Sequence, residues 1–219
     1  MGDHRRTGYR GRSDVVLCVA LSGPIIEPVG ANSGRACVVI RFASPEDRDA
    51  RMLAIQDIVR EVHKLDTVRS YRLVITGRAA ANRWSDAIAV PLRRAGFRIH
   101  LESSGTHMVL GAVDWHAITP VRGTAAVNQH ADEVRVVVDP TTEAHELDQY
   151  AARWRCDHYL VQPRSLDDVA HCAQLVAQRP RWRLAVDLRE VIPLPSRLSA
   201  IGSRLDAQPA AEAETGLLA

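Results

Sequence analysis

Histidines and one aspartate are the residues of this 219-residue chain that come closest to a metal-binding pattern. His100, His107, Asp114 and His116 lie near one another in the sequence, and two histidines with a carboxylate form a donor set that suits zinc. Their spacing matches no metal motif, which favours scattered surface histidines and predicts no metal site.

The cysteines offer no obvious catalytic or cluster motif. Cys18, Cys37, Cys156 and Cys172 show neither CxxC nor CxxxCxxC spacing. Cys18 and Cys37 stand in apolar, strand-like runs, where a free cysteine behaves as a small buried hydrophobe. Since there is neither a signal peptide nor an apolar run of about 18 residues, the sequence predicts a cytoplasmic protein with no membrane partner.

Composition excludes several further classes of function. The 28 basic side chains are balanced by 26 acidic ones, and Lys64 is the only lysine. We attribute the arginine bias to a GC-rich genome and expect no nucleic-acid partner. Neither GxGxxG nor GxxxxGK[ST] occurs, which removes the ordinary nucleotide-binding folds.

The elements that must position any site alternate between strand and helix. This alternation predicts an α/β protein with a mostly parallel sheet or a partial barrel. One domain is expected over 14–198, with a disordered basic arm at 1–13 and a flexible tail at 199–219. The expected strands are 15–21, 37–42, 71–76, 97–101, 115–118, 133–138, 158–161 and 182–188, and the expected helices are 45–65, 84–95, 143–155 and 165–178.

One junction between a strand and a helix carries unusually clear local signals. The run Val38–Phe42 is apolar and β-branched, which favours a buried strand. Ser44 has the chemistry of an N-cap, Pro45 suits the first helical position, and Asp47 adds negative charge there. The sequence therefore predicts a helix that begins at Pro45 and runs to about Leu65.

Six phrases, in this order, resemble the 7-carboxy-7-deazaguanine synthases, which are radical S-adenosylmethionine enzymes that make the 7-deazaguanine core. The resemblance covers residues 15–195 and implies an incomplete (β/α) barrel of the radical S-adenosylmethionine type, usually dimeric. The phrases are Arg72–Gly77, Ala95–Thr106, Asp114–Trp115, Ala131–Asp139, Tyr159–Pro163 and Pro180–Leu184.

The chain departs from the family where the family's chemistry lies. Members carry a CxxxCxxC-type loop after the strand that corresponds to Val38–Phe42, and its three thiolates hold a [4Fe–4S] cluster. Here Ala43–Asp47 follows instead, and no other cysteine trio has suitable spacing. We therefore expect no cofactor: no [4Fe–4S] cluster, no radical chemistry and no S-adenosylmethionine.

Three further motifs are altered. The family's T-G-G-E-P reads Thr76–Ala80, and its Arg78 would repel the cofactor's ammonium group. The family's S-P-K reads Thr119–Val121 and has lost its lysine, while the late Q-x-H-K cluster reads Asp187–Glu190. The losses are concentrated at catalytic positions.

Some ligand-binding positions of the family keep suitable residues. By resemblance, Glu27 and Arg41 would bind a pterin-like substrate, the arginine through its carboxylate. The alternative is purely structural: Arg41 pairs with an acid, and Ser104 with Gly105 makes a turn. Residual cofactor-contact positions are Thr76, Gly77, Glu102, Ser104 and Gly105.

Three hypotheses follow. The first is a catalytically degenerate relative of the synthases, which acts in 7-deazapurine metabolism as a ligand-binding or partner subunit. It would form a homodimer, or a heterodimer with an intact paralogue. The second is an enzyme that uses Glu27, Arg41 and Glu102 for non-radical chemistry on a pterin- or purine-like molecule. The third is a protein-interaction module with no small-molecule ligand.

Overall fold

The computed structural model describes residues 15–77 and 80–192. The predictions for the N-terminal arm, the C-terminal tail and Arg78 therefore fall outside the described residues. Within the described ranges, no helix is long and apolar enough to cross a membrane.

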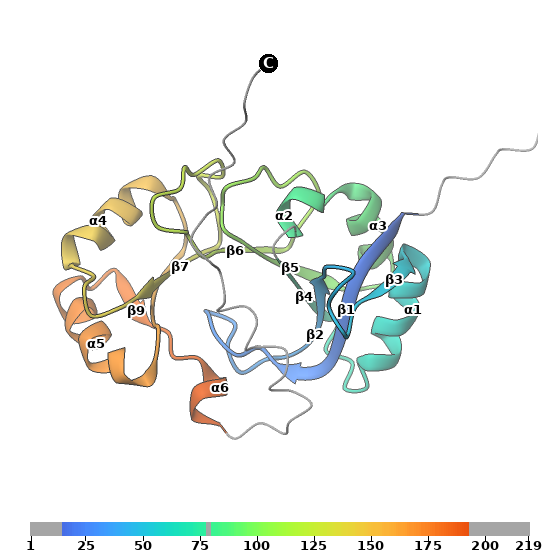
Figure 1. Cartoon of the computed structure of the whole chain (residues 1–219), viewed down its shortest axis with the longest axis horizontal. Helices are drawn as coiled ribbons and strands as arrows, with labels where there is room; N and C mark the ends of the chain where they lie inside the picture. Colours follow the sequence, from blue (N-terminus) through green and yellow to red (C-terminus); the bar gives the residue numbers. More distant parts are fainter. Residues whose placement is uncertain (1–14, 78–79, 193–219) are drawn as a thin grey trace, which may run out of the picture.

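A nine-stranded sheet forms the frame of the molecule. From β2 onward, each strand is parallel to its neighbour, whereas β1 pairs antiparallel with both β2 and β3. The sheet curves without closing, because β3 and β9 are its two free edges (Figure 1). In sheet order, the strands are β3 (Arg51–Ala54), β1 (Val16–Ile26), β2 (Ala36–Phe42), β4 (Arg72–Thr76), β5 (Arg98–Ser103), β6 (Trp115–Ile118), β7 (Glu133–Val138), β8 (His158–Pro163) and β9 (Trp182–Leu184).

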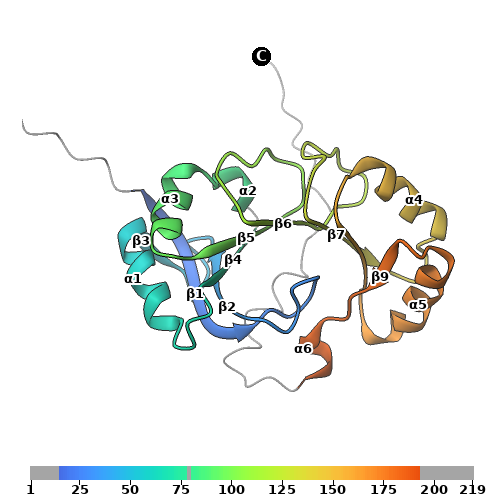
Figure 2. The ribbon, with the colours of Figure 1, turned by 180° about the vertical axis from the view of Figure 1, so that it is seen from behind.

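Helices cover the outer side of this arc. One group lies over the strands of the N-terminal half and a second group over β7 to β9, and the view from behind shows the same division (Figure 2). The first group is α1 (Ile55–Leu65), α2 (Ala80–Arg83) and α3 (Asp86–Arg94); the second is α4 (Ala144–Arg153), a 3-10 turn (Leu166–Asp168) and α5 (Val169–Gln178), and a short α6 (Leu188–Val191) follows β9.

Alternate residues of each strand face the two sides of the sheet. On β5, Ile99 and Leu101 belong to the apolar core under the first group of helices. His100 and Glu102 point to the other, inner side, and both contact polar partners there. Because the strands are parallel, their carboxyl ends meet at one edge of the sheet, which is where α/β folds place ligands.

Most of the predicted elements are confirmed. Strands β6 and β7 begin and end where the sequence predicts, and α4 lies within its predicted range. The first strand is longer than expected, because the chain from Ser22 to Ile26 continues to pair with β2 across a bulge. The last strand is shorter, since β9 ends at Leu184.

The helix predicted from Pro45 is wrong in its first half. Residues 51–54 form β3, which pairs with β1, and the helix begins only at Ile55 after Ala54. Ser44 does not cap a helix; its hydroxyl bonds the Glu46 side chain, and its carbonyl accepts the Asp47 N–H at 3.0 Å. Pairing with an existing strand outweighed a local capping signal.

Candidate functional site

Six charged or titratable side chains gather on the inner side of the sheet, and we call them the interior charged cluster. Three are carboxylates, two are guanidinium groups and one is an imidazole. They come from the position just after β1 and from the parallel strands β4, β5 and β7, with β6 between the last two. The members are Glu27, Arg72, His100, Glu102, Glu133 and Arg135.

Arg135 links the carboxylates of the cluster. Its side chain is only 5% exposed; its Nη2 donates to Glu102 Oε1 at 3.0 Å, and its Nη1 lies 3.7 Å from Glu133 Oε1. Burial opposes ionisation of Glu102, but Arg135, His100 and the Thr76 hydroxyl outweigh it and hold the pKa of this carboxyl below its usual value. Glu102 is therefore a carboxylate at neutral pH.

Glu27 is the most deeply placed acid that the sequence predicted for the site. Its side chain is 1% exposed, and its Oε2 accepts a hydrogen bond from Arg72 Nη2 at 3.1 Å. Its Oε1 lies 2.8 Å from His100 Nδ1. A buried carboxylate needs such partners, because an isolated charge in the interior would be strongly disfavoured.

The loop between β1 and β2 closes over part of the cluster, and Figure 1 shows it inside the arc of the sheet. The Ala31 N–H donates to Glu133 Oε2 at 2.9 Å, and Arg135 Nη1 donates to the Val29 carbonyl at 3.2 Å. Gly30 makes this approach feasible, because a Cβ there would lie 2.5 Å from Glu133 Oε1.

Several polar atoms of the cluster have no hydrogen-bond partner among the described residues. Native proteins rarely leave buried polar atoms in this condition, and one explanation is a group that binds there. The atoms concerned are Glu27 Oε1, Arg72 Nε, both ring nitrogens of His100 and Glu133 Oε1. The 2.8 Å approach of His100 to Glu27 is close enough for attraction but lacks the alignment of a hydrogen bond.

Arg41, the other predicted substrate-binding residue, is occupied by acids of the following loop. Its Nη1 donates to Asp47 Oδ2 at 2.5 Å and its Nη2 to Asp49 Oδ1 at 2.7 Å. Burial disfavours the charged guanidinium, but these two carboxylates raise the pKa of Arg41 overall. The loop after β2 therefore holds the arginine by its own side chains.

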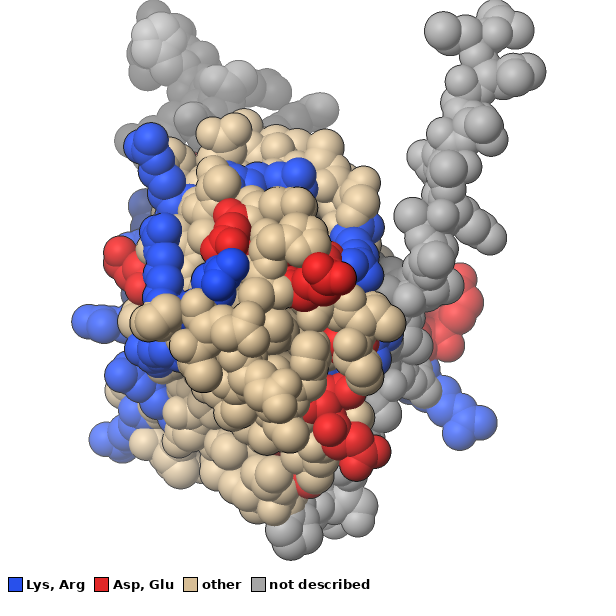
Figure 3. Space-filling view, turned by 90° about the vertical axis from the view of Figure 1, so that its left-hand side faces the viewer, with Lys and Arg blue, Asp and Glu red and all other residues tan. Residues whose placement is uncertain are grey.

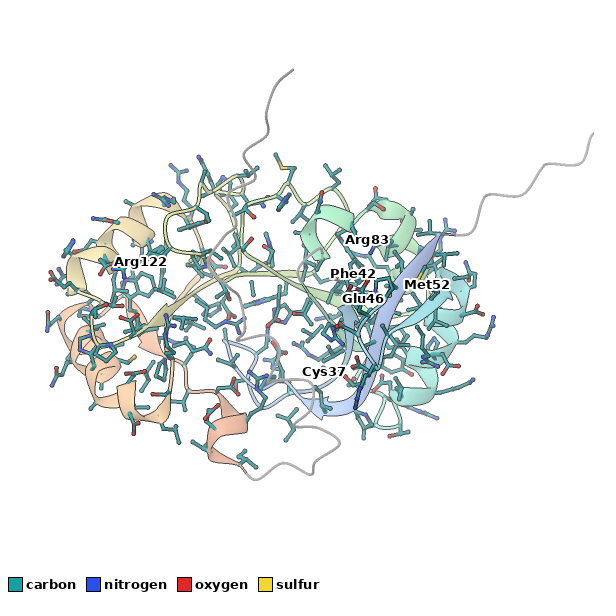
Figure 4. The ribbon with its side chains drawn as sticks, in the orientation of Figure 1. Cys37, Phe42, Glu46, Met52, Arg83 and Arg122 are labelled. Carbon is teal, nitrogen blue, oxygen red and sulfur yellow. The ribbon has the colours of Figure 1, made fainter. Side chains whose placement is uncertain are left out.

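Gly77 packs directly against the backbone of Phe42, the last residue of β2. Its φ is +109°, and a Cβ there would lie 2.3 Å from the Phe42 carbonyl oxygen. On the same edge, the Arg83 guanidinium stands 5.9 Å from the centre of the Phe42 ring, and Figure 4 shows Phe42, Glu46 and Arg83 near one another. Thr76 is the register partner of Arg41 on the neighbouring strand. Its hydroxyl hydrogen-bonds the Glu102 carboxyl.

The remaining predicted positions form the turn that follows β5. Ser104 Oγ and Thr106 Oγ1 are 2.7 Å apart, while the Gly105 N–H donates to Ser103 Oγ at 3.1 Å. Gly105 has a φ of +77°, a conformation that favours glycine. Both residues therefore lie beside the carboxyl end of β5, and the structure does not bring them into the interior charged cluster.

The residues present do not fit an iron–sulfur cluster. All four cysteines lie in the described ranges, on β1, on β2, after α4 and on α5. Cys37 lies at the end of β2 opposite Phe42 (Figure 4), and burial, with Glu27 adding to it, raises the pKa of its thiol to about 12. Among the described residues, no three His, Cys, Asp or Glu side chains converge to hold a metal.

Fold and site together define an incomplete α/β barrel whose inner face carries a cluster of buried charged side chains. No family model matches the chain. The 7-carboxy-7-deazaguanine synthase of Bacteroides thetaiotaomicron is 25% identical over 174 residues, which are 75% of this chain and 91% of that protein. That of Burkholderia multivorans is 26% identical over 186 residues, 76% of this chain and 83% of that one.

A solved structure agrees with these relatives. The crystal structure of QueE from Escherichia coli matches with a TM-score of 0.67 and 18% identity, over 78% of this chain and 94% of that one. The fold is thus an incomplete α/β barrel like that of this solved structure. This chain is a divergent relative of the 7-carboxy-7-deazaguanine synthases.

Sequence reasoning missed most of the interior charged cluster. Arg72, Glu133 and Arg135 stand inside the phrases that carry the resemblance. The prediction of surface histidines is wrong for His100 and His116, which are 3% and 7% exposed. The available signal was the alternation along each strand. Charged residues at every second position of otherwise apolar runs, such as Glu133 and Arg135, would have indicated one shared polar face.

Proposed function

We propose that this protein acts in 7-deazapurine metabolism as a binding or partner subunit without radical chemistry, and that it holds a pterin- or purine-like molecule in the interior charged cluster. The observation that carries the proposal is the set of buried, unpartnered polar atoms in that cluster. The absence of a cysteine trio, combined with close relatedness in fold, supports the loss of the radical step.

The chemistry of the cluster matches that of a purine-like ligand. Aminopyrimidinone rings present adjacent N–H donors, which pair well with a carboxylate. Glu27 Oε1 accepts no hydrogen bond, although His100 Nδ1 lies 2.8 Å from it. Arg72 Nε and a ring nitrogen of His100 provide further groups for ring nitrogens or a carbonyl. Arg41 is left out of the proposed contacts, because Asp47 and Asp49 already hold its guanidinium.

Ligand binding is tested by calorimetry and thermal unfolding with 7-carboxy-7-deazaguanine, pterin and guanine. We expect at least one to bind and to raise the apparent Tm, since a ligand that binds only the folded state stabilises it. Glu27→Gln should abolish the shift, whereas Glu61→Gln, on the exposed side of α1, should leave it intact. No binding by any of the three would refute the ligand and favour a protein-interaction role.

The loss of radical chemistry has its own test. We expect that anaerobic reconstitution with iron and sulfide yields neither stoichiometric iron nor charge-transfer absorbance, and that S-adenosylmethionine is not cleaved. Formation of a cluster together with reductive cleavage would overturn this part of the proposal while leaving ligand binding intact.

A partner role and the absence of nucleic acid stay predictions. Figure 3 shows the face over α4 and α5 with blue arginine side chains along one edge and red acids among and beside them. Arg179 is held by Asp148 and Arg122 by Glu146, which supports a mixed surface more than a phosphate-binding one. Light scattering of the protein, alone and with an intact paralogue, tests the homodimer and the heterodimer.

A further inference from the structure

A serine and a histidine meet on the outer side of the sheet, away from the interior charged cluster. Ser103 is the last residue of β5 and His116 the second of β6. In the register of the two strands, Leu101 pairs with His116 and Ser103 with Ile118. Leu101 and Ile118 belong to the apolar cores on the helical side, so Ser103 and His116 share that side.

The hydrogen bonds orient the serine hydroxyl toward the imidazole. Ser103 Oγ lies 2.8 Å from His116 Nε2. The same oxygen accepts the Gly105 N–H at 3.1 Å, so that its own hydrogen is free to point to the ring. The ring also hydrogen-bonds the backbone of His130. A nucleophile, a base and a group that orients the base are the parts of an activated serine.

The imidazole is in the form that a base requires. His116 is 7% exposed. Burial, together with the nearby His100, lowers its pKa below the ordinary value, and Asp132 and the bond to His130 oppose this only in part. The ring is therefore neutral at pH 7 and can accept a proton.

An unused hydrogen-bond donor lies close to the same turn. Trp154 is 2% exposed, and its Nε1 has no hydrogen-bond partner among the described residues. This nitrogen would be 3.6 Å from a Cβ built on Gly105, the residue whose N–H contacts Ser103 Oγ. The Trp154 N–H therefore borders the turn that contacts the serine hydroxyl, and a donor next to a nucleophile's turn can stabilise a developing oxyanion.

We propose that Ser103 and His116 form an esterase site, with Ser103 as nucleophile, His116 as general base and the Trp154 N–H as oxyanion donor, acting on small activated carboxylic esters. Ser103 Oγ attacks the carbonyl carbon while its proton passes to His116 Nε2. The alkoxide leaves with that proton, and an acyl-serine remains. Water then hydrolyses the acyl-serine, with His116 taking its proton and returning one to Ser103. This activity does not depend on the proposed ligand of the barrel interior.

The test uses the full-length protein with a fluorophosphonate probe and with p-nitrophenyl acetate. We expect one covalent adduct per chain, mapped to the peptide that contains Ser103, and release of p-nitrophenol above the buffer rate. Ser103→Ala should abolish both. His116→Gln should slow labelling by about 100-fold, which is the lower end of general-base contributions.

Ser44→Ala serves as the matched control, because this exposed serine also bonds a polar side chain but faces no histidine in the structure. It should label and hydrolyse as the wild type does. Circular dichroism checks that each variant is folded. If His116→Gln unfolds, Ser103→Ala decides the question alone, since it removes one hydroxyl from a partly buried position. No adduct on the wild type, or an adduct that persists in Ser103→Ala, would overturn the proposal.

Discussion

The carboxyl end of β2 and the interior charged cluster, both on parallel strands of one sheet, differ in how their polar groups are satisfied. At the end of β2, Arg41 is held by Asp47 and Asp49, and Gly77 packs onto Phe42. In the cluster, Glu27, His100 and Glu133 each keep at least one buried atom without a hydrogen bond. One region is closed by its own side chains, whereas the other is not.

The turn after β2 is self-contained, because its own acids hold the Arg41 guanidinium. The interior charged cluster balances its charges largely against one another, with a few backbone groups such as the Ala31 N–H and the Val29 carbonyl beside them. Buried polar groups that are only partly satisfied are unusual in native proteins, which is why the interior charged cluster is the proposed ligand site.

Removal of Arg135 should have the largest effect on stability. Arg135→Met keeps much of the side-chain volume but leaves Glu102 and Glu133 without their shared cation. Breaking a buried ion pair from one side typically destabilises a protein by about 3 to 5 kcal/mol. Urea unfolding of the variant measures the loss. Arg83→Met, at the exposed end of α2, should cost less than about 1 kcal/mol. Equal losses of unfolding free energy in the two variants would contradict the claimed difference between the interior charged cluster and the end of β2.

Close packing at the end of β2 predicts the next effect. Gly77→Ala forces a Cβ toward the Phe42 carbonyl at a positive φ, and we expect a loss of about 2 to 3 kcal/mol. Gly34 has a φ of +86° and open space around it, so Gly34→Ala should cost only about 1 kcal/mol. Comparing the thermal unfolding of the two variants separates the cost of the steric contact with Phe42 from the cost of backbone strain at positive φ, which both variants share. Similar losses would mean that the β2 end is looser than its contacts indicate.

The sequence was a good guide to the fold and a partial guide to the site. The strand Glu133–Val138 was found because four of its six residues are valine, and β-branched residues favour strands. The helix at Pro45 failed because residues 51–54 pair with β1, a contact that no local signal encodes. Glu27 and Glu102 were named by resemblance, but their partners Arg72 and Arg135 come from other strands, and only the sheet register brings them together.

The stability of the protein at low pH should depend on Glu102 of the interior charged cluster, because the pKa of this carboxyl is lowered in the folded protein. A lowered folded pKa gives stability that is present above the unfolded value of 4.5 and is lost as the pH falls through the folded value. At pH 7, Glu102→Gln should be less stable by about 1 to 2 kcal/mol. Urea unfolding from pH 7 to pH 3 should show this gap narrowing as the wild-type carboxyl takes up its proton. A constant gap would mean that Glu102 is not paired as a charge.

Arg41 should show the smallest effect, and it decides whether the two regions are independent. Arg41→Gln removes both contacts with the loop, but Asp49 is 56% exposed, so solvent screening limits the loss to about 0.5 to 1 kcal/mol. Arg60→Gln, which breaks an exposed pair on α1, should cost less than about 0.5 kcal/mol.

The more informative readout for Arg41→Gln is the Kd for 7-carboxy-7-deazaguanine, measured by calorimetry. If the acids hold the guanidinium, Arg41→Gln should leave this Kd nearly unchanged. A tenfold weaker Kd, equivalent to about 1.4 kcal/mol, would instead mean that Arg41 leaves its acids for the ligand, and that the end of β2 and the interior form one site.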